Sequence, residues 1–185
     1  MAHADKVRWN EKYQDSKIPN EPISLVVEYA TTSKGKQALD IACGMGRHSR
    51  YLSNNGFHVD ALDISSVAIS QLKDLPYITP QEVDFDTYTL KDNSYDLIVC
   101  TYYLERTLFP QMIAALKAGG ILIFETFLYD EENERAPSNP DFILQKGELE
   151  SAFEPSCKLL KLTPWWDKDY QGYKTLKISM VAQKY

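Results

Sequence analysis

Apolar and polar positions along the middle of the chain form a repeating order of short apolar runs and longer amphipathic stretches. Runs typical of β-strands cover residues 37–41, 57–62, 78–83, 95–100 and 121–127. Helices are predicted between them at residues 46–54, at residues 65–73, and from about Pro110 to Gly119-Gly120. Strands and helices that alternate in this way are joined by right-handed crossovers, which predicts a parallel sheet with helices on both faces.

The last third of the chain departs from this order. Residues 129–145 are polar and predict a long loop, and residues 147–153 predict a short helix. Residues 157–162 and 176–182 are predicted strands, separated by a connection that contains tryptophan and aspartate. Two consecutive strands without a helix between them pair as an antiparallel hairpin. Ahead of the sheet, we expect helices over residues 6–13 and 23–30 that cap it.

Composition restricts the class of protein. The chain has 185 residues and a formal net charge of −6, which indicates one domain and disfavours nucleic acid as a partner. No apolar run is long enough to span a membrane, and the first residues lack the apolar core of a signal peptide. The three cysteines are far apart, which indicates reduced thiols rather than disulfides or a metal site. We therefore expect a cytoplasmic protein with a small-molecule partner, as a monomer or weak homodimer.

The segment that follows the first predicted strand carries the most specific chemistry. It begins at Asp40 and continues through Ala42, Cys43, Gly44 and Gly46 to a helix. Glycines at these positions let the backbone turn sharply and approach a ligand, although they also suit an ordinary strand-to-helix turn. In an open parallel sheet, ligands bind beyond the C-terminal ends of the strands.

Acidic residues at the ends of the next two strands make a ligand site more specific. Asp63 ends the second strand, where a carboxylate can accept hydrogen bonds from both hydroxyls of a ribose. Asp84 follows the third strand, next to Phe85, where an acidic side chain can accept from an adenine amino group. Three ligand-facing positions at three successive strand ends therefore predict a nucleoside ligand.

Two nucleoside cofactors fit such a sheet, and Asp40 distinguishes them. A carboxylate beside the loop repels the diphosphate of a nicotinamide dinucleotide but attracts an ammonium and a sulfonium. A dinucleotide loop also has a third glycine, where this chain has Ser49. The sequence therefore favours S-adenosylmethionine.

The stretch from Leu39 to Gly56, followed by Val59 to Asp63, resembles the class I S-adenosylmethionine-dependent methyltransferases. Within them it is most similar to the tellurite-resistance (TehB-type) and thiopurine methyltransferase-like branch, whose N-terminal W-x-x-x-Y motif resembles Trp9 to Tyr13. Residues 95–99 and 116–122 resemble the signatures of the fourth and fifth strands, with Ala118 in place of the more frequent proline. The likeness covers roughly residues 9–127.

This resemblance implies a single Rossmann-like α/β domain over residues 1–185. Its mainly parallel seven-stranded sheet would have the order 3-2-1-4-5-7-6, with one antiparallel strand and helices on both faces. Residues 1–34 would form a helical cap, residues 35–127 the cofactor-binding core, and residues 128–185 an acceptor-side loop, a short helix and a β-hairpin.

The resemblance also implies which residues bind the cofactor. Asp63 would hold the ribose, Asp84 and Phe85 the adenine, and Thr101 would border the methionine half. Arg47 would neutralise the carboxylate, and Trp9 and Tyr13 would close over the cofactor, or else pack within the capping helix. The expected cofactor-binding residues are Trp9, Tyr13, Asp40, Ala42, Cys43, Gly44, Gly46, Arg47, Asp63, Ile64, Asp84, Phe85 and Thr101.

The acceptor is expected beyond the fourth and fifth strands. Tyr103 and Arg106 are the expected catalytic residues, the alternative being a structural loop in which Arg106 pairs with Glu105 or Asp130. His48 is expected to be a helix residue rather than a base. The wider set of acceptor-side candidates is Tyr102, Tyr103, Glu105, Arg106, Glu125, Thr126, Trp165 and Trp166.

The expected reaction is in-line methyl transfer to a small molecule, such as a thiol or an oxyanion of tellurium or selenium. No Asn-Pro-Pro-Tyr motif, the usual signature of nucleic-acid amino methylation, is present. Two alternatives stay open at this point: a nicotinamide-dependent oxidoreductase with the same sheet, and a non-catalytic module that binds the cofactor.

Overall fold

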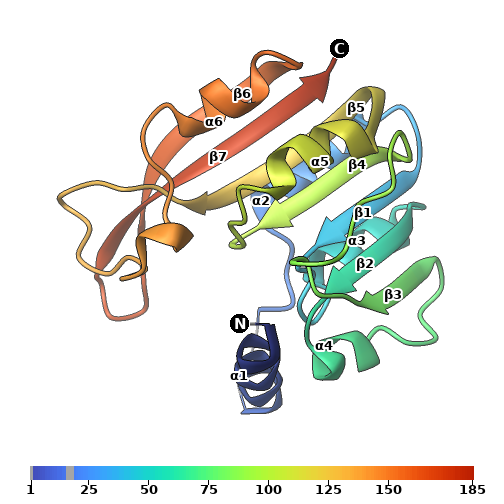
Figure 1. Ribbon diagram of the computed structural model, residues 1–185, viewed down its shortest axis with the longest axis horizontal. Helices are drawn as coiled ribbons and strands as arrows, with labels where there is room; N and C mark the ends of the chain where they lie inside the picture. The colour runs from blue at the N-terminus through green and yellow to red at the C-terminus, as the bar shows by residue number, and fades with distance from the viewer. Residues whose placement is uncertain (1, 16–18) are drawn as a thin grey trace.

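The computed structural model describes residues 2–15 and 19–185, and a seven-stranded sheet forms its centre (Figure 1). Met1 and residues 16–18, which belong to the expected N-terminal cap, lie outside the described residues. The strand order is β3-β2-β1-β4-β5-β7-β6, which confirms the expected order. The strands are Gln37–Ile41 (β1), His58–Asp63 (β2), Ile78–Glu82 (β3), Tyr95–Thr101 (β4), Leu116–Phe127 (β5), Cys157–Lys168 (β6) and Lys174–Lys184 (β7).

The direction of the strands follows from the connections between them. β1 to β5 run parallel, and β7 is antiparallel to both of its neighbours, β5 and β6. The chain proceeds from β1 outward to β3 and then returns to place β4 on the other side of β1. The C-terminal ends of β1 and β4 therefore meet where the strand order reverses, the position at which such sheets bind ligands.

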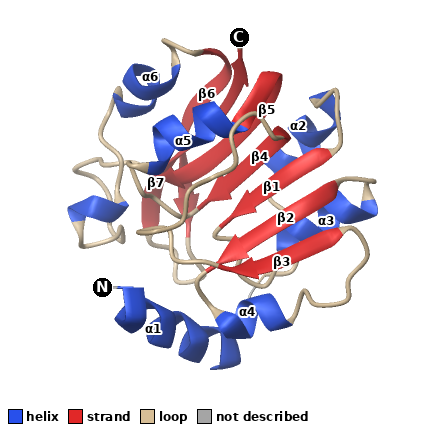
Figure 2. Cartoon of the chain, turned by 45° about the vertical axis from the view of Figure 1, so that its right-hand side comes forward, coloured by secondary structure: helices blue, strands red, loops and turns tan. Residues whose placement is uncertain are grey.

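Successive side chains of the strands enter two apolar layers on opposite sides of the sheet. Ile98 and Phe124 pack in the layer that α5 and α6 cover, and Leu97 and Ile123 pack in the layer of α2 and α3 (Figure 2). The helices are α1 (Ala2–Asp15), α2 (Ser24–Tyr29), α3 (Arg47–Asn54), α4 (Ser66–Ser70), α5 (Leu108–Ala115) and α6 (Glu148–Phe153), with 3-10 turns at Ala30–Thr32 and Pro140–Phe142.

The fifth helix and the fifth strand differ from their expected boundaries. α5 begins at Leu108, so Pro110 is its third residue rather than its first. The N–H groups of the first turn have no partner within a helix, and a proline is therefore tolerated there. The helix ends at Ala115, and β5 includes Gly119 and Gly120, because Leu116 already pairs with β4 before a shift in register.

Two other expected boundaries were also wrong. α4 is shorter than residues 65–73 and ends at Ser70. β6 continues past Leu162 to Lys168, so Trp165 and Trp166 belong to the strand and not to the connection. Pro164 lies within this strand, which a proline can do at the edge of a sheet.

The two ends of the sheet and the N-terminal helix complete the fold. β3 and β6 are the edge strands, and each contains a proline, Pro80 and Pro164. α1 lies beside α4, at the end of the sheet toward which β1, β2 and β3 point (Figure 2). Within residues 2–15 and 19–185, no helix is long and apolar enough to cross a membrane.

Two glycines allow a test of how tightly the loop after β1 is packed. Gly46 and Gly56 have φ of 78° and 80°, but a Cβ on Gly46 would overlap the buried side chain of Leu72, whereas a Cβ on Gly56 would meet open space. We expect Gly56→Ala to lower the free energy of unfolding by about 1 kcal/mol through backbone strain, and Gly46→Ala by roughly a further 1–3 kcal/mol through overpacking. Urea unfolding of both variants measures the difference, and equal losses would contradict the packing argument.

Candidate functional site

The loop after β1 reverses direction through three residues with left-handed backbone angles. Ala42, Gly44 and Gly46 have φ of 53°, 54° and 78°. This path carries the loop across the end of β2, where the Cys43 amide donates to the Leu62 carbonyl at 2.9 Å. It ends at the N-terminus of α3, whose free N–H groups favour a negatively charged ligand group such as a carboxylate.

Asp63, at the end of β2, joins the glycine loop to the start of α4. Its Oδ2 accepts the amide of Gly44 and its Oδ1 the amide of Ser65, both at 2.8 Å. Burial raises the pKa of Asp63, and the backbone N–H donors oppose this shift. Each oxygen holds one donor and keeps acceptor capacity for another, so the carboxylate suits the paired hydroxyls of a ribose. Ile64, half-buried, follows directly.

Asp40 lies beneath the glycine loop and is fully buried. Its Oδ2 accepts the hydroxyl of Ser49 at 2.6 Å, which explains why a serine stands where a dinucleotide loop has its third glycine. Burial raises the pKa of Asp40 to about 7, and the Ser49 hydrogen bonds and the Arg47 charge oppose this shift. A positively charged ligand stabilises the ionised carboxylate, so this residue fits an ammonium and a sulfonium better than a diphosphate.

Asp84 and Phe85 lie in the turn after β3. The Asp84 carboxylate accepts the amide of Asp86 at 3.0 Å and so shapes the turn. The Phe85 ring is buried, and its centroid lies 5.4 Å from that of Tyr103. Tyr103 therefore packs beside the residues expected to hold the adenine, and its expected role in turnover stays a prediction.

The N-terminal helix rests on the loops that follow β1 and β2. The rings of Trp9 and Tyr13 stack with centroids 5.5 Å apart, and the Tyr13 hydroxyl lies 2.7 Å from the position that a Cβ on Gly44 would occupy. Burial raises the pKa of Tyr13, as does the nearby Asp63. The Asn10 carboxamide oxygen accepts the Ser65 hydroxyl at 2.6 Å, so α1 is tied to the residue that itself donates to Asp63.

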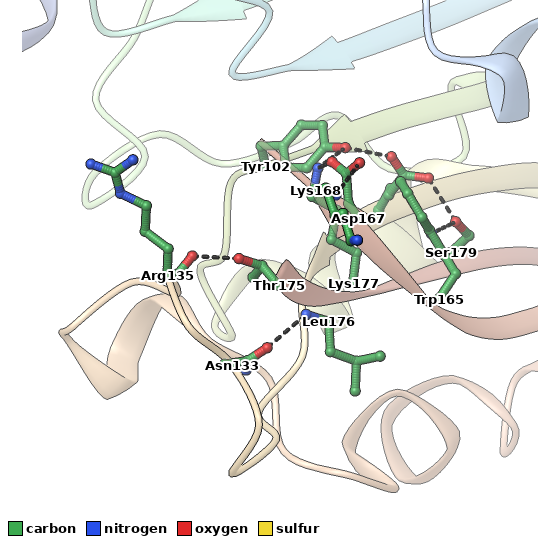
Figure 3. Close-up of polar contacts among 11 residues, drawn as sticks. Tyr102, Asn133, Arg135, Trp165, Asp167, Lys168, Thr175, Leu176, Lys177 and Ser179 are labelled. Carbon is green, nitrogen blue, oxygen red and sulfur yellow. Dashed lines mark hydrogen bonds and ion pairs between the residues drawn. The ribbon is translucent and has the colours of Figure 1, made fainter. Parts of the chain in front are cut away.

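A second polar cluster lies at the ends of β4 and β5. Tyr102, with φ of 56°, directs its hydroxyl to Oε1 of Glu125 at 2.7 Å. Oε2 of Glu125 accepts the Ser179 hydroxyl at 2.6 Å, and Ser179 in turn accepts the indole N–H of Trp165 at 2.9 Å (Figure 3). Four strands or their following loops thus supply one hydrogen-bonded cluster.

Lys177 connects this cluster to the β6–β7 hairpin. Its Nζ lies 2.6 Å from Oδ2 of Asp167 and donates to the Tyr102 hydroxyl at 3.3 Å (Figure 3). The ammonium also lies 4.8 Å from the ring centroid of Tyr102 and 5.3 Å from that of Trp165. Lys177 thus contacts both the ring of Tyr102 and the hydroxyl that donates to Glu125.

A cleft of about 230 Å³ opens beside Glu125. Glu125 of β5 lies opposite Thr101 in the register of β4 and β5. Thr101 is the residue expected to border the methionine half of the cofactor. The guanidinium of Arg47 lies 5.6 Å from the ring of Tyr102, so the cluster also adjoins the glycine loop. The cleft is lined by Ser24, Leu25, Glu28, Glu125, Lys161, Thr163, Trp165 and Ser179.

Arg106 contacts α6 and the loop before it. Its guanidinium pairs with Glu148, rather than with Glu105 or Asp130, and donates to the carbonyls of Asp141 at 2.9 Å and Ile143 at 3.0 Å. These contacts anchor the long loop to the start of α5. Its expected contribution to turnover stays a prediction.

His48 lies in the first turn of α3 and is buried. Its Nε2 accepts the backbone amide of Ile23 at 3.4 Å, which ties α3 to the start of α2. Burial lowers the pKa of His48 to about 3, and the Arg47 charge adds to this shift. A neutral, occupied imidazole of this kind supports the fold.

Sequence reasoning missed Ser179 and Lys177 as members of the acceptor-side cluster. Both lie on the same face of β7 as Val181, because the three positions are two residues apart. Val181 packs in the apolar layer that α2 covers. Two polar residues on the buried face of a strand are the signal that would have identified them, because buried polar groups need hydrogen-bond partners.

Comparisons with a family model and with curated sequences both find methyltransferases. A family model described as a methyltransferase domain matches residues 14–160. A ubiquinone biosynthesis O-methyltransferase from Coxiella burnetii is 33% identical over 110 residues, which cover 54% of this chain and 47% of that protein. The protein of the same name from Thiobacillus denitrificans is 25% identical over 133 residues, covering 64% and 57% respectively. This chain thus spans about half the length of the curated relatives it matches.

Solved structures share the fold. TehB from Haemophilus influenzae aligns with a TM-score of 0.77 and 23% identity, covering 97% of this chain and 67% of that one. A SAM-dependent methyltransferase from Methanosarcina mazei aligns with a TM-score of 0.67 and 18% identity, covering 89% and 98% respectively.

Asp63 is expected to accept hydrogen bonds from the ribose hydroxyls of the cofactor, and its replacement should weaken cofactor binding. We expect Asp63→Ala to weaken binding of S-adenosylhomocysteine by roughly 2–4 kcal/mol, because a buried acceptor for two hydroxyls is lost. Asp84→Ala should weaken it less, since one adenine contact is lost and water can replace it. Isothermal titration calorimetry measures both, and wild-type affinity in both variants would refute the ribose and adenine assignments.

The raised pKa of Asp40 should make the binding of S-adenosylmethionine depend on pH. Below its pKa of about 7, Asp40 carries a proton that a cationic ligand displaces, so the affinity for S-adenosylmethionine should rise with pH, by at most about tenfold per unit, and level off above it. Asp40→Asn removes this group and is the control. Titrations between about pH 5.5 and about pH 7.5 should show a slope in wild type that the variant lacks, and identical slopes would rule out the coupling.

Proposed function

This chain belongs to the methyltransferase domain family, and we propose that it transfers a methyl group to a hydroxyl oxygen or a thiol sulfur of a small molecule. The methyl donor is S-adenosylmethionine, as in the family and its structural neighbours. The chain is therefore a SAM-dependent methyltransferase and not the nicotinamide-dependent oxidoreductase that its sheet alone would also suit.

The observation that carries the proposal is the cleft beside Glu125. Its volume of about 230 Å³ is below the roughly 300–1,000 Å³ of sites for drug-sized ligands, which favours a small acceptor. A buried carboxylate in its wall favours an acceptor that donates a hydrogen bond. Glu28 and Lys161 also line the cleft as an ion pair, so the buried Glu125 carboxylate adds a net negative charge there, which disfavours an oxyanion of tellurium or selenium.

The relatives support oxygen as an acceptor atom. Those from Coxiella burnetii and Thiobacillus denitrificans are named as O-methyltransferases. A hydroxyl and a thiol both carry a proton that must leave during methyl transfer, so both agree with the carboxylate in the cleft.

The chain would act mainly by positioning. When bound, the cofactor supplies an electrophilic methyl group. Asp63 and the glycine loop hold the nucleoside end at β1 and β2, while the cleft holds the acceptor between α2 and the strands β5, β6 and β7. Fixing both partners on one rigid sheet supplies the alignment that in-line displacement requires, and alignment accounts for much of the reduction in barrier.

An acceptor screen tests this proposal. Catechol, thiophenol and 2-mercaptoethanol are incubated with the enzyme and S-adenosylmethionine, alongside tellurite and selenite, and release of S-adenosylhomocysteine is measured. We expect release with a hydroxyl or thiol probe and not with the oxyanions. Release with tellurite or selenite alone, or with none of the probes, would overturn the proposed acceptor class.

A further inference from the structure

Glu125 is a carboxylate that the cofactor half of the site does not use. It is 4% exposed, yet it forms part of the wall of the cleft. Each of its oxygens accepts one hydroxyl hydrogen bond, from Tyr102 on one side and Ser179 on the other. A buried carboxylate held between two donors has a fixed orientation and retains lone pairs for a further donor.

The two hydroxyl groups act as donors to Glu125 and not as bases. Burial raises the pKa of Tyr102 far above neutrality, and the hydrogen bond to Glu125 adds to this shift. Tyr102 therefore keeps its proton and points it at Oε1. Its left-handed backbone is a strained conformation for a tyrosine, of the kind found where a side chain must be aimed at a site.

The charges around Glu125 come from several elements. Arg47 at the start of α3 lies over the Tyr102 ring, and Lys177 of β7 donates to the Tyr102 hydroxyl. On the side of the cleft, Glu28 of α2 is paired with Lys161 of β6. Arg47 and Lys177 both contact Tyr102, while Glu125 itself lines the cleft.

From this geometry, and on the premise of the proposed function, we infer that Glu125 receives the proton of the acceptor. As the acceptor oxygen or sulfur forms its bond to the methyl carbon, the methyl–sulfonium bond breaks and its electron pair stays on the cofactor's sulfur. The O–H or S–H proton passes to the Glu125 carboxylate and then to water. No further reactant is needed, because the acceptor gains the methyl group and loses one proton while the sulfonium becomes a neutral thioether.

Tyr102 and Ser179 are positioning residues in this arrangement. Each donates its hydroxyl to one oxygen of Glu125 and so holds that oxygen in place. Trp165 supports Ser179 from the hairpin side, so the β6–β7 hairpin takes part in fixing the carboxylate.

The test compares Glu125→Gln with a matched surface variant, Glu132→Gln, whose carboxylate is 69% exposed in an ion pair with Lys174. With the hydroxyl or thiol probe that turns over, we expect Glu125→Gln to lower kcat at least about 100-fold and to abolish the acidic limb of the pH–rate profile. Affinity for S-adenosylhomocysteine should stay within about threefold of wild type. Glu132→Gln should behave like wild type.

A binding measurement keeps the inference testable without turnover. Saturation-transfer NMR reports contact between catechol and the complex with S-adenosylhomocysteine, and this contact should weaken in Glu125→Gln but not in Glu132→Gln. Undiminished kcat or undiminished catechol contact in folded Glu125→Gln would overturn the role of Glu125 and leave the acceptor class standing. Absence of product with every probe would instead refute the acceptor class.

Tyr102→Phe provides a second variant should Glu125→Gln fail to fold. It removes one donor from Glu125 and leaves the ring in place. We expect a roughly tenfold lower kcat and a displaced acidic limb of the pH–rate profile, with unchanged cofactor affinity. An unchanged pH–rate profile would contradict the positioning role and, with it, the proton transfer to Glu125.

Discussion

The hydrogen bonds of one carboxylate, that of Asp63, hold together the loops at the C-terminal ends of β1 and β2. By accepting the amides of Gly44 and Ser65, it joins the loop after β1 to the loop after β2 and to the start of α4. The left-handed residues of the first loop are needed because only such a path brings the Gly44 amide to the end of the neighbouring strand. Asp40, Arg47 and the rest of the site depend on the loop that this bond fixes.

The sheet then separates the two halves of the chemistry. Tyr102 and Tyr103, which are consecutive in the loop after β4, point to opposite faces of the sheet. Tyr103 packs against Phe85 in the layer of α5 and α6, while Tyr102 donates to Glu125 on the face that α2 covers. In the proposed function, the nucleoside and the acceptor would therefore approach the sheet from different sides. The contacts of Arg106 with Glu148 and two backbone carbonyls fasten the long loop to the start of α5.

The sequence predicted correctly the features that depend on residues close together in the chain. The glycine loop, Asp63 and the alternation of strands and helices all follow from residues close together in the chain, and the family resemblance supplied the strand order. The sequence offered Tyr102, Glu125 and Trp165 as acceptor-side candidates, but not their hydrogen bonds or Ser179, because these residues come together only through the register of β5, β6 and β7. Trp165 was placed in a connection, although the edge strand β6 continues through Pro164 to Lys168. The partner of Arg106, Glu148, lies in a helix that no local pattern links to it.

The prolines of the two edge strands affect how copies of this chain can meet. A free strand edge is a template on which another chain can add its own strand, the usual route to aggregation of open sheets. Pro80 in β3 and Pro164 in β6 each remove an N–H donor that such an added strand would need. The lysines at positions 158, 161 and 168 of β6 add like charges along one of these edges. An open sheet with seven strands is thus hindered by its own sequence from growing at its two edges.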